Sequence, residues 1–314
     1  MSVVEARSRE RRVQVTERAL PGRRRDRGYL PYLVPGVLLF LVVIAVPLVM
    51  NVGLSFTRWQ GVGDPDWVGV DQYRKLFADE TFWISFRNNA ALILAMAVIP
   101  TFLGLLLATA LFDVVAKRNP RTTTALRAAF YLPQVLPTVV AGVVWAWILH
   151  PEYGAANELL RFLGLDSWTQ NWLGDEKTAL LSVMFVLVWI QIGYPLVIFM
   201  AGLQRVDPQL YEAAALDGAN WWQRLWAVTV PQIRQEIFVV LLTCTIAALK
   251  SFDKIFVLTR GGPGGSTITP SYFSFQNFFE KANVGYGAAI ATVLTAIIVG
   301  LTFLFLRLQN REDR

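Results

Sequence analysis

The sequence predicts an all-α, polytopic membrane protein with six transmembrane helices. Of its 314 residues 54% are apolar, and the mean hydropathy is +0.44, values too high for an ordinary soluble domain. A helix that crosses a hydrocarbon core about 30 Å thick needs about 20 predominantly apolar residues. Six stretches meet or approach that length: 31–56, 88–112, 127–149, 179–203, 236–258 and 285–307.

Prolines and charges make some of the predicted spans irregular. Pro133 and Pro137 interrupt the third span, and the fifth contains charged residues near its end. A proline within a helix removes a backbone hydrogen bond and can kink the helix. Kinks suit a gated bundle, but they are also common in static membrane bundles, so both interpretations stay open. The other prolines within spans are Pro35, Pro47, Pro100 and Pro195.

The distribution of charge predicts the topology. The net charge is +6, and residues 1–29 hold nine arginines against four acids, which is typical of a cytoplasmic segment. The loop 113–126 is also basic, whereas the loop 57–87 has at least as many acids as bases and the loop 150–178 is mostly acidic. Alternation of basic and acidic loops predicts that both termini are cytoplasmic.

This topology divides the chain into three parts. The apolar segment begins after about 30 residues and is too long for the core of a signal peptide, so we expect it to be retained as an anchor. The basic tail is expected to set the topology and to contact anionic lipid, and a regulatory role stays open. The parts are a cytoplasmic tail 1–29, a six-helix transmembrane domain 30–308 and a cytoplasmic C-terminal tail 309–314.

The sequence lacks the residues that most enzyme chemistries need. It has one cysteine, Cys244, and one histidine, His150, so an internal disulfide is excluded and a His-based metal site is not expected. No G-x4-G-K-[ST] loop is present, and the stretch GGPGGST lacks the phosphate-binding lysine. We expect no catalytic residue, no metal and no cofactor on this chain, and we interpret GGPGGST as an extracellular turn.

Two loops on the predicted outer side carry helical patterns. Val70, Tyr73 and Phe77 fall on one face of the stretch VDQYRKLF. The stretch EYGAANELLRFLG predicts a second helix, ended by Gly164. We expect both helices to cap the bundle from outside.

The loop 204–235 predicts two short helices joined by a turn, which we call the elbow. The first helix, 208–217, has an N-cap, a first-turn proline and a terminal glycine. The second has an N-cap and ends at a proline that stops or kinks it before the next span. These signals are Asp207, Pro208 and Gly218 for the first helix, and Asn220 and Pro231 for the second.

Physical reasoning alone leaves three interpretations of the elbow. Its tryptophans, Trp221, Trp222 and Trp226, favour a helix that lies in the membrane interface. A structural connector fits as well. A compact helical knob with an alanine-rich flank could equally pack into a groove of a cytoplasmic partner.

The elbow also carries a sequence motif. Three residues, Glu212-Ala213-Ala214, are followed by Gly218 six residues and by Pro231 nineteen residues after the glutamate. This pattern resembles the EAA motif, EAA-x3-G-x9-I-x-L-P, of the inner-membrane permease subunits of binding-protein-dependent ABC importers. The sequence departs from the motif at two positions, where Ile and Leu are replaced by Val228 and Val230.

A second stretch supports the same family. Residues 252–294, FDKIFVLTRGGPGGSTITPSYFSFQNFFEKANVGYGAAIATVL, resemble the L-T-x-G-G-P outer loop and following span of the carbohydrate-uptake branch, the maltose-permease-like subunits. Both motifs occur in the expected order and in the expected compartments. The resemblance covers roughly residues 30–308.

In that family the elbow is the coupling helix, which sits in a cleft of a cytoplasmic ATPase and transmits its closure to the membrane helices. The resemblance implies that Glu212 meets basic residues or helix ends of the ATPase, that Ala213 and Ala214 permit close approach, and that Gly218 makes the turn. It makes docking the leading interpretation. The implied ATPase-coupling residues are Glu212, Ala213, Ala214, Asp217, Gly218 and Pro231.

The end of the fifth predicted span places charge in the membrane. Lys250, Asp253 and Lys254 lie inside or near the outer third of the bilayer, where each charge costs about 2.5–3.5 kcal/mol unless it faces protein or water. On one continuous helix Asp253 would face Lys250, with Lys254 on its flank. Either the span ends earlier and these charges are interfacial, or this face lines a polar translocation cavity.

A sugar site combines hydrogen-bonding groups with an aromatic surface, and spans four and five offer such groups. The resemblance implies that Tyr194 matches a sugar-contacting tyrosine of the family, and that other lining positions carry changed residues, which puts maltose itself in doubt. Ordinary helix packing explains each of them equally well. The substrate-pathway candidates are Gln191, Tyr194, Cys244, Ala248, Lys250, Ser251 and Asp253.

The resemblance implies a permease subunit that imports a sugar or oligosaccharide across a bacterial inner membrane by alternating access. The implied partners are a second homologous permease, a cytoplasmic ABC ATPase dimer that binds ATP and Mg, an extracytoplasmic sugar-binding protein and membrane lipid, with no nucleic acid. An importer of a non-sugar solute, such as glycerol phosphate, phosphate or a polyamine, is the alternative. A membrane-embedded enzyme or a stand-alone channel is a more distant one.

Overall fold

A computed structural model describes residues 30–115 and 119–312 of the chain. By its internal contacts the chain divides into two compact units, residues 1–49 and 50–314, which are treated one at a time. The predicted basic tail and the lysine and arginine at 117 and 118 lie outside the described residues.

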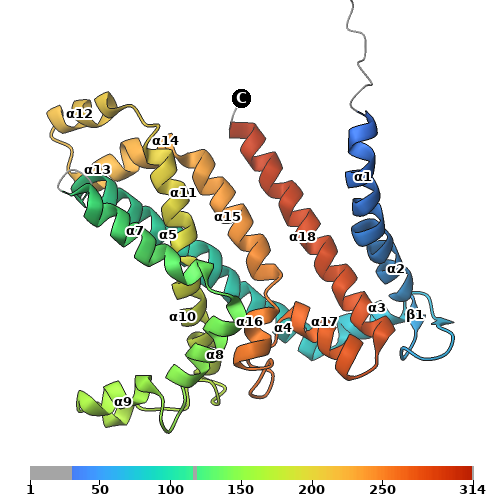
Figure 1. The fold of residues 1–314 in the computed structure, drawn as a ribbon. Coiled ribbons are helices and arrows are strands. Elements are labelled where there is room, and N and C mark those ends of the chain that lie inside the picture. Colours follow the sequence, from blue (N-terminus) through green and yellow to red (C-terminus); the bar gives the residue numbers. More distant parts are fainter. Residues whose placement is uncertain (1–29, 116–118, 313–314) are drawn as a thin grey trace, which may run out of the picture. The chain divides into compact units, whose positions relative to one another are not determined.

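The first unit contains the start of the first apolar span. Its described part consists of α1 (Leu30–Phe40), the π-helix η2 (Leu41–Ala45) and the beginning of α2 (Val46–Leu54). Together they form a continuous apolar helix, Tyr32–Leu54, which is long enough to cross a membrane and agrees with the span predicted at 31–56 (Figure 1).

Three further helices of membrane-spanning length lie in the second unit. Glu80–Asp113 is 34 residues long and starts earlier than predicted, because Asp79 caps it by accepting a hydrogen bond from the Thr81 backbone N–H at 2.8 Å. Ala179–Leu203 coincides with the prediction, and Val284–Gln309 extends the sixth predicted span by two residues at its C-terminal end. Their elements are α4 (Glu80–Ile93), η3 (Leu94–Val98), α5 (Ile99–Ala110), η4 (Leu111–Val115), α10 (Ala179–Gln191), α11 (Gly193–Leu203) and α18 (Val284–Glu312).

The third predicted span is a bent pair. Helices α7 (Pro120–Val135) and α8 (Thr138–Ile148) meet at 96°. Pro137 forces the residue before it, Leu136, into an extended conformation with ψ 135°, which ends α7. Pro137 therefore interrupts this span as the sequence predicts, whereas Pro133 does not, because it lies inside α7, which continues past it.

The fifth span ends earlier than predicted. Helix α15 (Arg234–Leu249) stops nine residues before 258, and a separate helix, α16 (Asp253–Leu258), follows a break at Lys250. The Ser251 carbonyl at the break accepts hydrogen bonds from side chains of a distant segment. Since its 16 residues rise only about 24 Å, α15 alone is shorter than a hydrocarbon core. By length and composition the described residues contain four spanning helices, or up to six if each bent pair is one span.

Three π-helical segments each precede a proline by two residues. They are η2 before Pro47, η3 before Pro100, and η6 (Leu225–Thr229) before Pro231. The proline ring has no N–H and clashes with the carbonyl one turn earlier, and a widened turn relieves that clash without ending the helix. At these places the chain continues as a helix.

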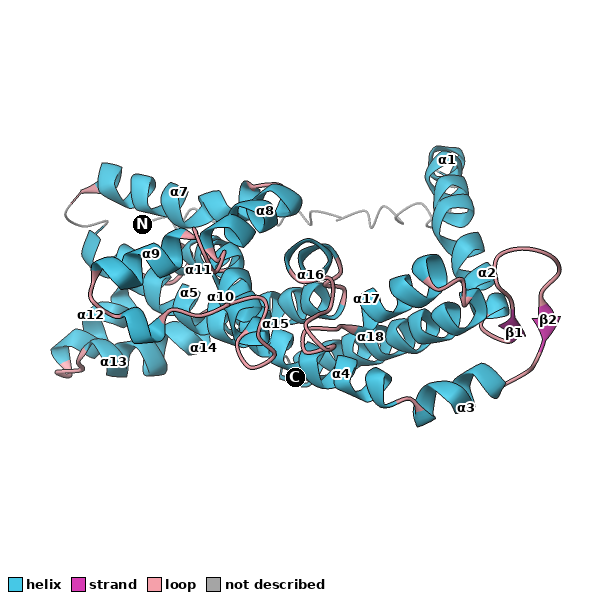
Figure 2. Cartoon of the chain, turned by 90° about the horizontal axis from the view of Figure 1, so that it is seen from below, coloured by secondary structure: helices cyan, strands magenta, loops and turns pink. Residues whose placement is uncertain are grey.

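Short elements fill the connections of the second unit (Figure 2). The strand pair β1 (Thr57–Arg58) and β2 (Asp66–Trp67) is antiparallel. Helix α3 forms as predicted, but the side chains that it buries are Gln72 and Leu76. Of the predicted apolar face, Tyr73 is half-buried, but Val70 and Phe77 are each about half exposed. The Gln72 amide instead points inward and donates to the Thr57 carbonyl at 2.9 Å. The remaining bounds are α3 (Asp71–Ala78), α9 (Ala155–Phe162), η5 (Asp166–Trp168), α17 (Pro270–Phe275) and η7 (Gln276–Glu280).

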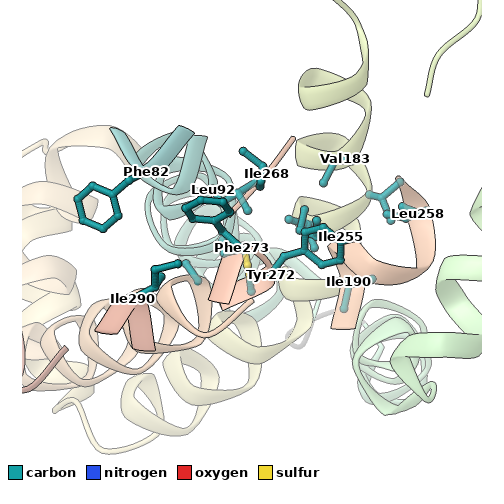
Figure 3. Packing of buried hydrophobic residues seen from close by; sticks show 14 of the residues in the cluster. Phe82, Leu92, Val183, Ile190, Ile255, Leu258, Ile268, Tyr272, Phe273 and Ile290 are labelled. Atoms are coloured by element: carbon teal, nitrogen blue, oxygen red, sulfur yellow. The ribbon is translucent and has the colours of Figure 1, made fainter. Parts of the chain in front are cut away.

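Two clusters of buried apolar side chains hold the second unit together. The first joins α4, α8, α10 and the α16–α18 region, and Figure 3 shows its side chains meeting in one shared interior. The second joins α5, α11 and α15, and reaches the elbow through Leu225 and Ile233. Close helix approach depends on small residues. A Cβ at Gly104 of α5 would lie 2.7 Å from the Pro195 Cβ of α11, and one at Gly193 would collide with the backbone of α7.

Candidate functional site: the elbow and the polar residues of the fourth and fifth spans

The first helix of the elbow, α12, runs from Pro208 to Leu216. The Asp207 carboxylate accepts a hydrogen bond from the Gln209 backbone N–H at 2.9 Å, and Pro208 occupies the first turn. Gly218, with φ +78°, ends the helix in the left-handed conformation. The predicted helix 208–217 and its start and stop signals are confirmed to within one residue.

The second helix of the elbow begins with a capping box. The Asn220 side chain accepts from the Gln223 backbone N–H at 3.0 Å, and the Gln223 side chain accepts from the Asn220 backbone N–H at 2.8 Å. The helix then continues through α13 (Trp221–Arg224), η6 and α14 (Val230–Gln232). It meets α15 at 77°, just after Pro231, as the sequence predicts.

A few contacts hold the two elbow helices to each other and to the bundle. The Tyr211 hydroxyl of α12 lies 3.1 Å from the Thr229 hydroxyl of η6, and burial raises the pKa of the Tyr211 hydroxyl. Thr229 and Leu225 are fully buried. Arg205, just before α12, forms an ion pair with Glu236 of α15. The elbow is therefore attached along one side only.

The opposite side of the elbow is open. Among the predicted coupling residues Glu212, Ala213, Asp217, Gly218 and Pro231 are exposed, and Ala214 is half-buried. Leu216 is 90% exposed, and about half of Trp222 and Trp226 is exposed. Figure 1 shows α12 and α13 at one end of the second unit, with α9 and α16 towards the other end. The EAA residues thus lie on a helix that is exposed over most of its length.

Most of the predicted pathway residues lie in packed surroundings. The Gln191 amide donates to the Cys244 thiol at 3.2 Å, and both side chains are buried. Ala248 and Ser251 are buried as well, while Tyr194 is half-buried against the second apolar cluster. The structure therefore brings spans four and five together at Gln191 and Cys244, which are 53 positions apart in the sequence.

The charged pathway residues are arranged differently from the prediction. Asp253 does not face Lys250, because the helix breaks between them; its carboxylate instead lies 3.2 Å from the Lys254 ammonium group. Lys250 is exposed at the C-terminus of α15. A lysine there interacts favourably with the carbonyl end of the helix.

Two asparagines belong to the same region and were not predicted. The Asn89 amide of α4 donates to the Ala248 carbonyl at 3.2 Å, near the break after α15. The Asn88 amide donates to the carbonyls of Gly265 and Ile268 at 3.3 and 3.1 Å. Both side chains are buried. Adjacent amides at the edge of an apolar stretch are the sequence signal that could have indicated them.

No group of three or more His, Cys, Asp or Glu side chains that could hold a metal ion is found among the described residues. The exposed part of the elbow consists of helix α12, the turn after it and two half-exposed tryptophans. Such a surface suits the binding of a partner better than the catalysis of a reaction.

The comparison with protein families is decisive. Residues 100–314 match the family described as "Binding-protein-dependent transport system inner membrane component". The chain belongs to this family.

Two known permeases are similar to the chain along most of their length. The diacetylchitobiose uptake system permease protein NgcF of Streptomyces coelicolor is 32% identical, over 90% of this chain and 83% of its own. The trehalose/maltose transport system permease protein MalF of Thermococcus litoralis is 31% identical, over 91% of this chain and 95% of its own.

A solved structure shows that the permease fold is shared. A chain of a bacterial ABC transporter involved in the import of the acidic polysaccharide alginate superposes with a TM-score of 0.79 at 22% identity, covering 92% of this permease and 97% of that chain. The all-α architecture with several membrane-spanning helices is therefore that of an ABC importer permease. The resemblance carried by the two sequence motifs is confirmed.

Proposed function

We propose that this permease is the transmembrane subunit of an ATP-driven importer that moves a sugar or oligosaccharide into the cytoplasm by alternating access. One observation carries the proposal: permeases for diacetylchitobiose and for trehalose and maltose align with about nine-tenths of the chain. These two relatives favour a carbohydrate as the substrate. The EAA motif alone would also allow a non-sugar solute, such as glycerol phosphate or a polyamine.

The proposed topology keeps both termini in the cytoplasm of a bacterial cell. It is supported by the acidic loop 150–178 and by the arrangement of the second unit, in which the elbow and α9 lie at opposite ends. The elbow is then cytoplasmic, and α3, α9 and the α16–α17 region are extracytoplasmic.

We assign ATP hydrolysis to partner chains, since the sequence has no phosphate-binding loop. In this proposal a cytoplasmic ABC ATPase dimer binds ATP and Mg, and this chain binds no cofactor. A second homologous permease completes the translocation path. An extracytoplasmic sugar-binding protein delivers the substrate, a role supported by a structure of the alginate transporter in complex with a pentasaccharide-bound periplasmic protein.

The elbow is the proposed contact with the ATPase. Glu212 and Asp217 present carboxylates to basic groups or helix ends of the partner, and the small side chains of Ala213 and Ala214 let its surface approach the helix. Gly218 and Pro231 fix the direction of the two elbow helices. Because the elbow is joined to α15 through the Arg205–Glu236 ion pair and to α11 through the second apolar cluster, a displacement of the elbow moves both spans.

We propose that the substrate path opens at the pathway residues. In the structure the side chains of Gln191 and Cys244 are in contact between spans four and five. Separation of these spans would expose the Gln191 amide, Tyr194 and the polar break at Ser251 to a substrate whose hydroxyl groups need hydrogen-bond partners. Lys250 and Asp253 would stand at the outer end of that path.

The test combines substrate uptake with a variant of the elbow. Uptake of a panel of radiolabelled mono- and oligosaccharides is measured in cells with the chain, without it, and with Ala213→Trp. A tryptophan at this exposed position should obstruct docking and reduce uptake at least about fivefold, since overpacking costs about 1–3 kcal/mol. Ala78→Trp, at an alanine of α3 that is also exposed, is the control and should transport normally.

Each outcome decides a separate point. Loss of uptake of one sugar on deletion supports the carbohydrate assignment, and loss with Ala213→Trp but not with Ala78→Trp supports the elbow. If deletion abolishes uptake while Ala213→Trp transports normally at wild-type membrane levels, the importer stands and the role of the elbow is wrong. If no sugar is affected, the substrate class is wrong.

A further inference from the structure

Helix α9 and the turn after it carry an apolar surface that nothing in the described chain covers. Its members are large side chains of one short amphipathic segment, and each is more than half exposed. They are Leu159 (58%), Phe162 (86%), Leu163 (59%) and Trp168 (67%). We call them the α9 apolar surface.

The α9 apolar surface is held outward by polar contacts on the other side of the segment. The buried Asn157 side chain donates to the carbonyls of Pro151 and Gln170 at 2.9 and 3.0 Å and accepts from the Trp172 indole N–H at 2.8 Å. Arg161 is paired with Glu158 at 2.5 Å. The exposure of the apolar side chains is therefore a fixed property of the fold, since buried hydrogen bonds determine which face turns inward.

The same surface continues along a membrane-spanning helix. Val140, Val144 and Trp147 form an exposed apolar stripe on α8. Trp147 and Ile148 then line a groove together with Tyr153 and Ala155, which leads to α9. The α9 apolar surface is thus an extension of the outward face of α8.

The outward face of α8 has the composition of a lipid-facing surface. Helix–helix interfaces in membranes are rich in small residues, and in α8 Ala141 and Gly142 are buried while Ala146 is half-buried. A Cβ at Gly142 would lie 2.8 Å from Val257 of α16, which shows where α8 meets protein. The outward stripe has only bulky valines and tryptophan, and no polar group that a translocation path or a second permease could use.

We propose that α9 is an interfacial helix, whose apolar surface lies in the outer leaflet of the bilayer at the boundary between headgroups and acyl chains. Amphipathic helices bury such a face about 5–10 Å into this region, with aromatic side chains at the headgroup level. The loop 150–178 has five acids and two bases, so apolar burial holds it there and anionic lipid does not. The inference depends on the membrane location of the family and, for the choice of leaflet, on the proposed topology; it does not depend on which solute is carried.

Spin labels on single cysteines test this placement. Labels are introduced at Phe162→Cys and Leu159→Cys, and at Glu158→Cys as the control next to Leu159 on the polar side. Native Cys244 is fully buried, and the unsubstituted chain serves as the labelling blank. Membranes are prepared from cells in which the variant replaces the native chain, so that its partners are present. Collisions of each label with oxygen, which partitions into lipid, and with a water-soluble nickel chelate are compared by power saturation.

The expected result is several-fold more collision with oxygen than with the nickel chelate at 159 and 162, and the reverse at 158. Nickel collisions that dominate at all three positions would mean that α9 lies in water, and the proposal would be wrong. Low collision with both reagents at 159 and 162 would mean that protein covers the surface, which overturns the proposal in favour of an interface with another subunit.

Discussion

The elbow and the segment 250–275 are built alike but differ in what surrounds them. Each consists of two short helices joined by a turn with at least one glycine at positive φ. Each also has a side-chain cap, Asp207 in the elbow and Thr269 before α17. In the elbow the turn and most of α12 are exposed. In the segment 250–275 residues 267–270 are buried.

The buried segment pairs several of its hydroxyl groups within the chain, although the Ser251 and Ser266 hydroxyls are buried without a hydrogen-bond partner among the described residues. The Thr267 hydroxyl lies 2.7 Å from the Thr259 hydroxyl and donates to the Gly262 carbonyl at 2.8 Å. The Thr269 and Ser271 hydroxyls donate to the Ser251 carbonyl at 3.1 and 2.9 Å. Such a network fixes one conformation.

The elbow is held differently: one hydroxyl pair, Tyr211 with Thr229, links its two helices, and the Arg205–Glu236 ion pair links it to α15. The difference teaches that the same local architecture occurs in two settings. The segment 250–275 is packed into the bundle, whereas the elbow exposes its turn and most of α12, as the proposed contact with a partner requires. Three substitutions can break or sharpen this comparison.

The largest effect on stability is expected from Gly261→Ala in the segment 250–275. Gly261 has φ +77°, and the added Cβ would lie 2.9 Å from the Tyr272 ring. Backbone strain of about 1–2 kcal/mol adds to an overpacking cost of about 1–3 kcal/mol, so the free energy of unfolding should fall by about 2–5 kcal/mol. Thermal unfolding of the purified protein in lipid nanodiscs measures it. An unchanged melting temperature would show that this segment is as adaptable as the elbow.

A smaller loss of stability is expected from Thr269→Val. The substitution removes both the cap of α17 and the hydrogen bond to Ser251 while it preserves side-chain shape, which should cost about 1–3 kcal/mol. Thr243→Val is the matched control, since this exposed hydroxyl donates only to the carbonyl one turn earlier, at 2.7 Å. Equal melting temperatures for the two variants would contradict the structural role of the network.

The smallest loss of stability, but a clear loss of transport, is expected from Gly218→Ala. Gly218 has φ +78°, yet no atom lies within 4 Å of the added Cβ, so only backbone strain of about 1–2 kcal/mol applies. A change in the direction of α12 should lower ATP-dependent uptake more than this small destabilisation can explain. Gly300→Ala, at an open helical position, controls for the added methyl group. If Gly218→Ala lowered the melting temperature as much as Gly261→Ala does, the turn of the elbow would be as tightly packed as the turn of the segment 250–275, and the comparison would be wrong.

What the sequence predicts correctly depends on how local the signals are. The caps and the terminal glycine of α12 lie within a dozen residues of each other, and they predict that helix to within one residue. The bend of the third span follows from Pro137 for the same reason. The EAA and L-T-x-G-G-P motifs predict the family because they preserve spacing as well as residue type.

The errors arise where distant residues decide. The end of α15 is fixed by contacts of Ser251 with side chains 18 and 20 positions away, which a hydropathy pattern does not contain. The inward face of α3 is set by the contact of Gln72 with Thr57. The contact of Gln191 with Cys244 and the role of Asn88 and Asn89 likewise need the tertiary structure. Whether the candidate residues bind an ATPase or a sugar stays a prediction.

The widened turns before Pro47, Pro100 and Pro231 have a consequence for comparing permeases by sequence. A π-helical turn holds one residue more than an α-helical turn, and each residue of an α-helix advances its side chain by about 100°. Deletion of a single residue within Leu94–Val98 would therefore change the angular phase between Asn88 and Gly104, so that only one of them could keep its present neighbours. Single-residue alignment gaps between related permeases should thus gather at these three places, each paired with a replaced proline.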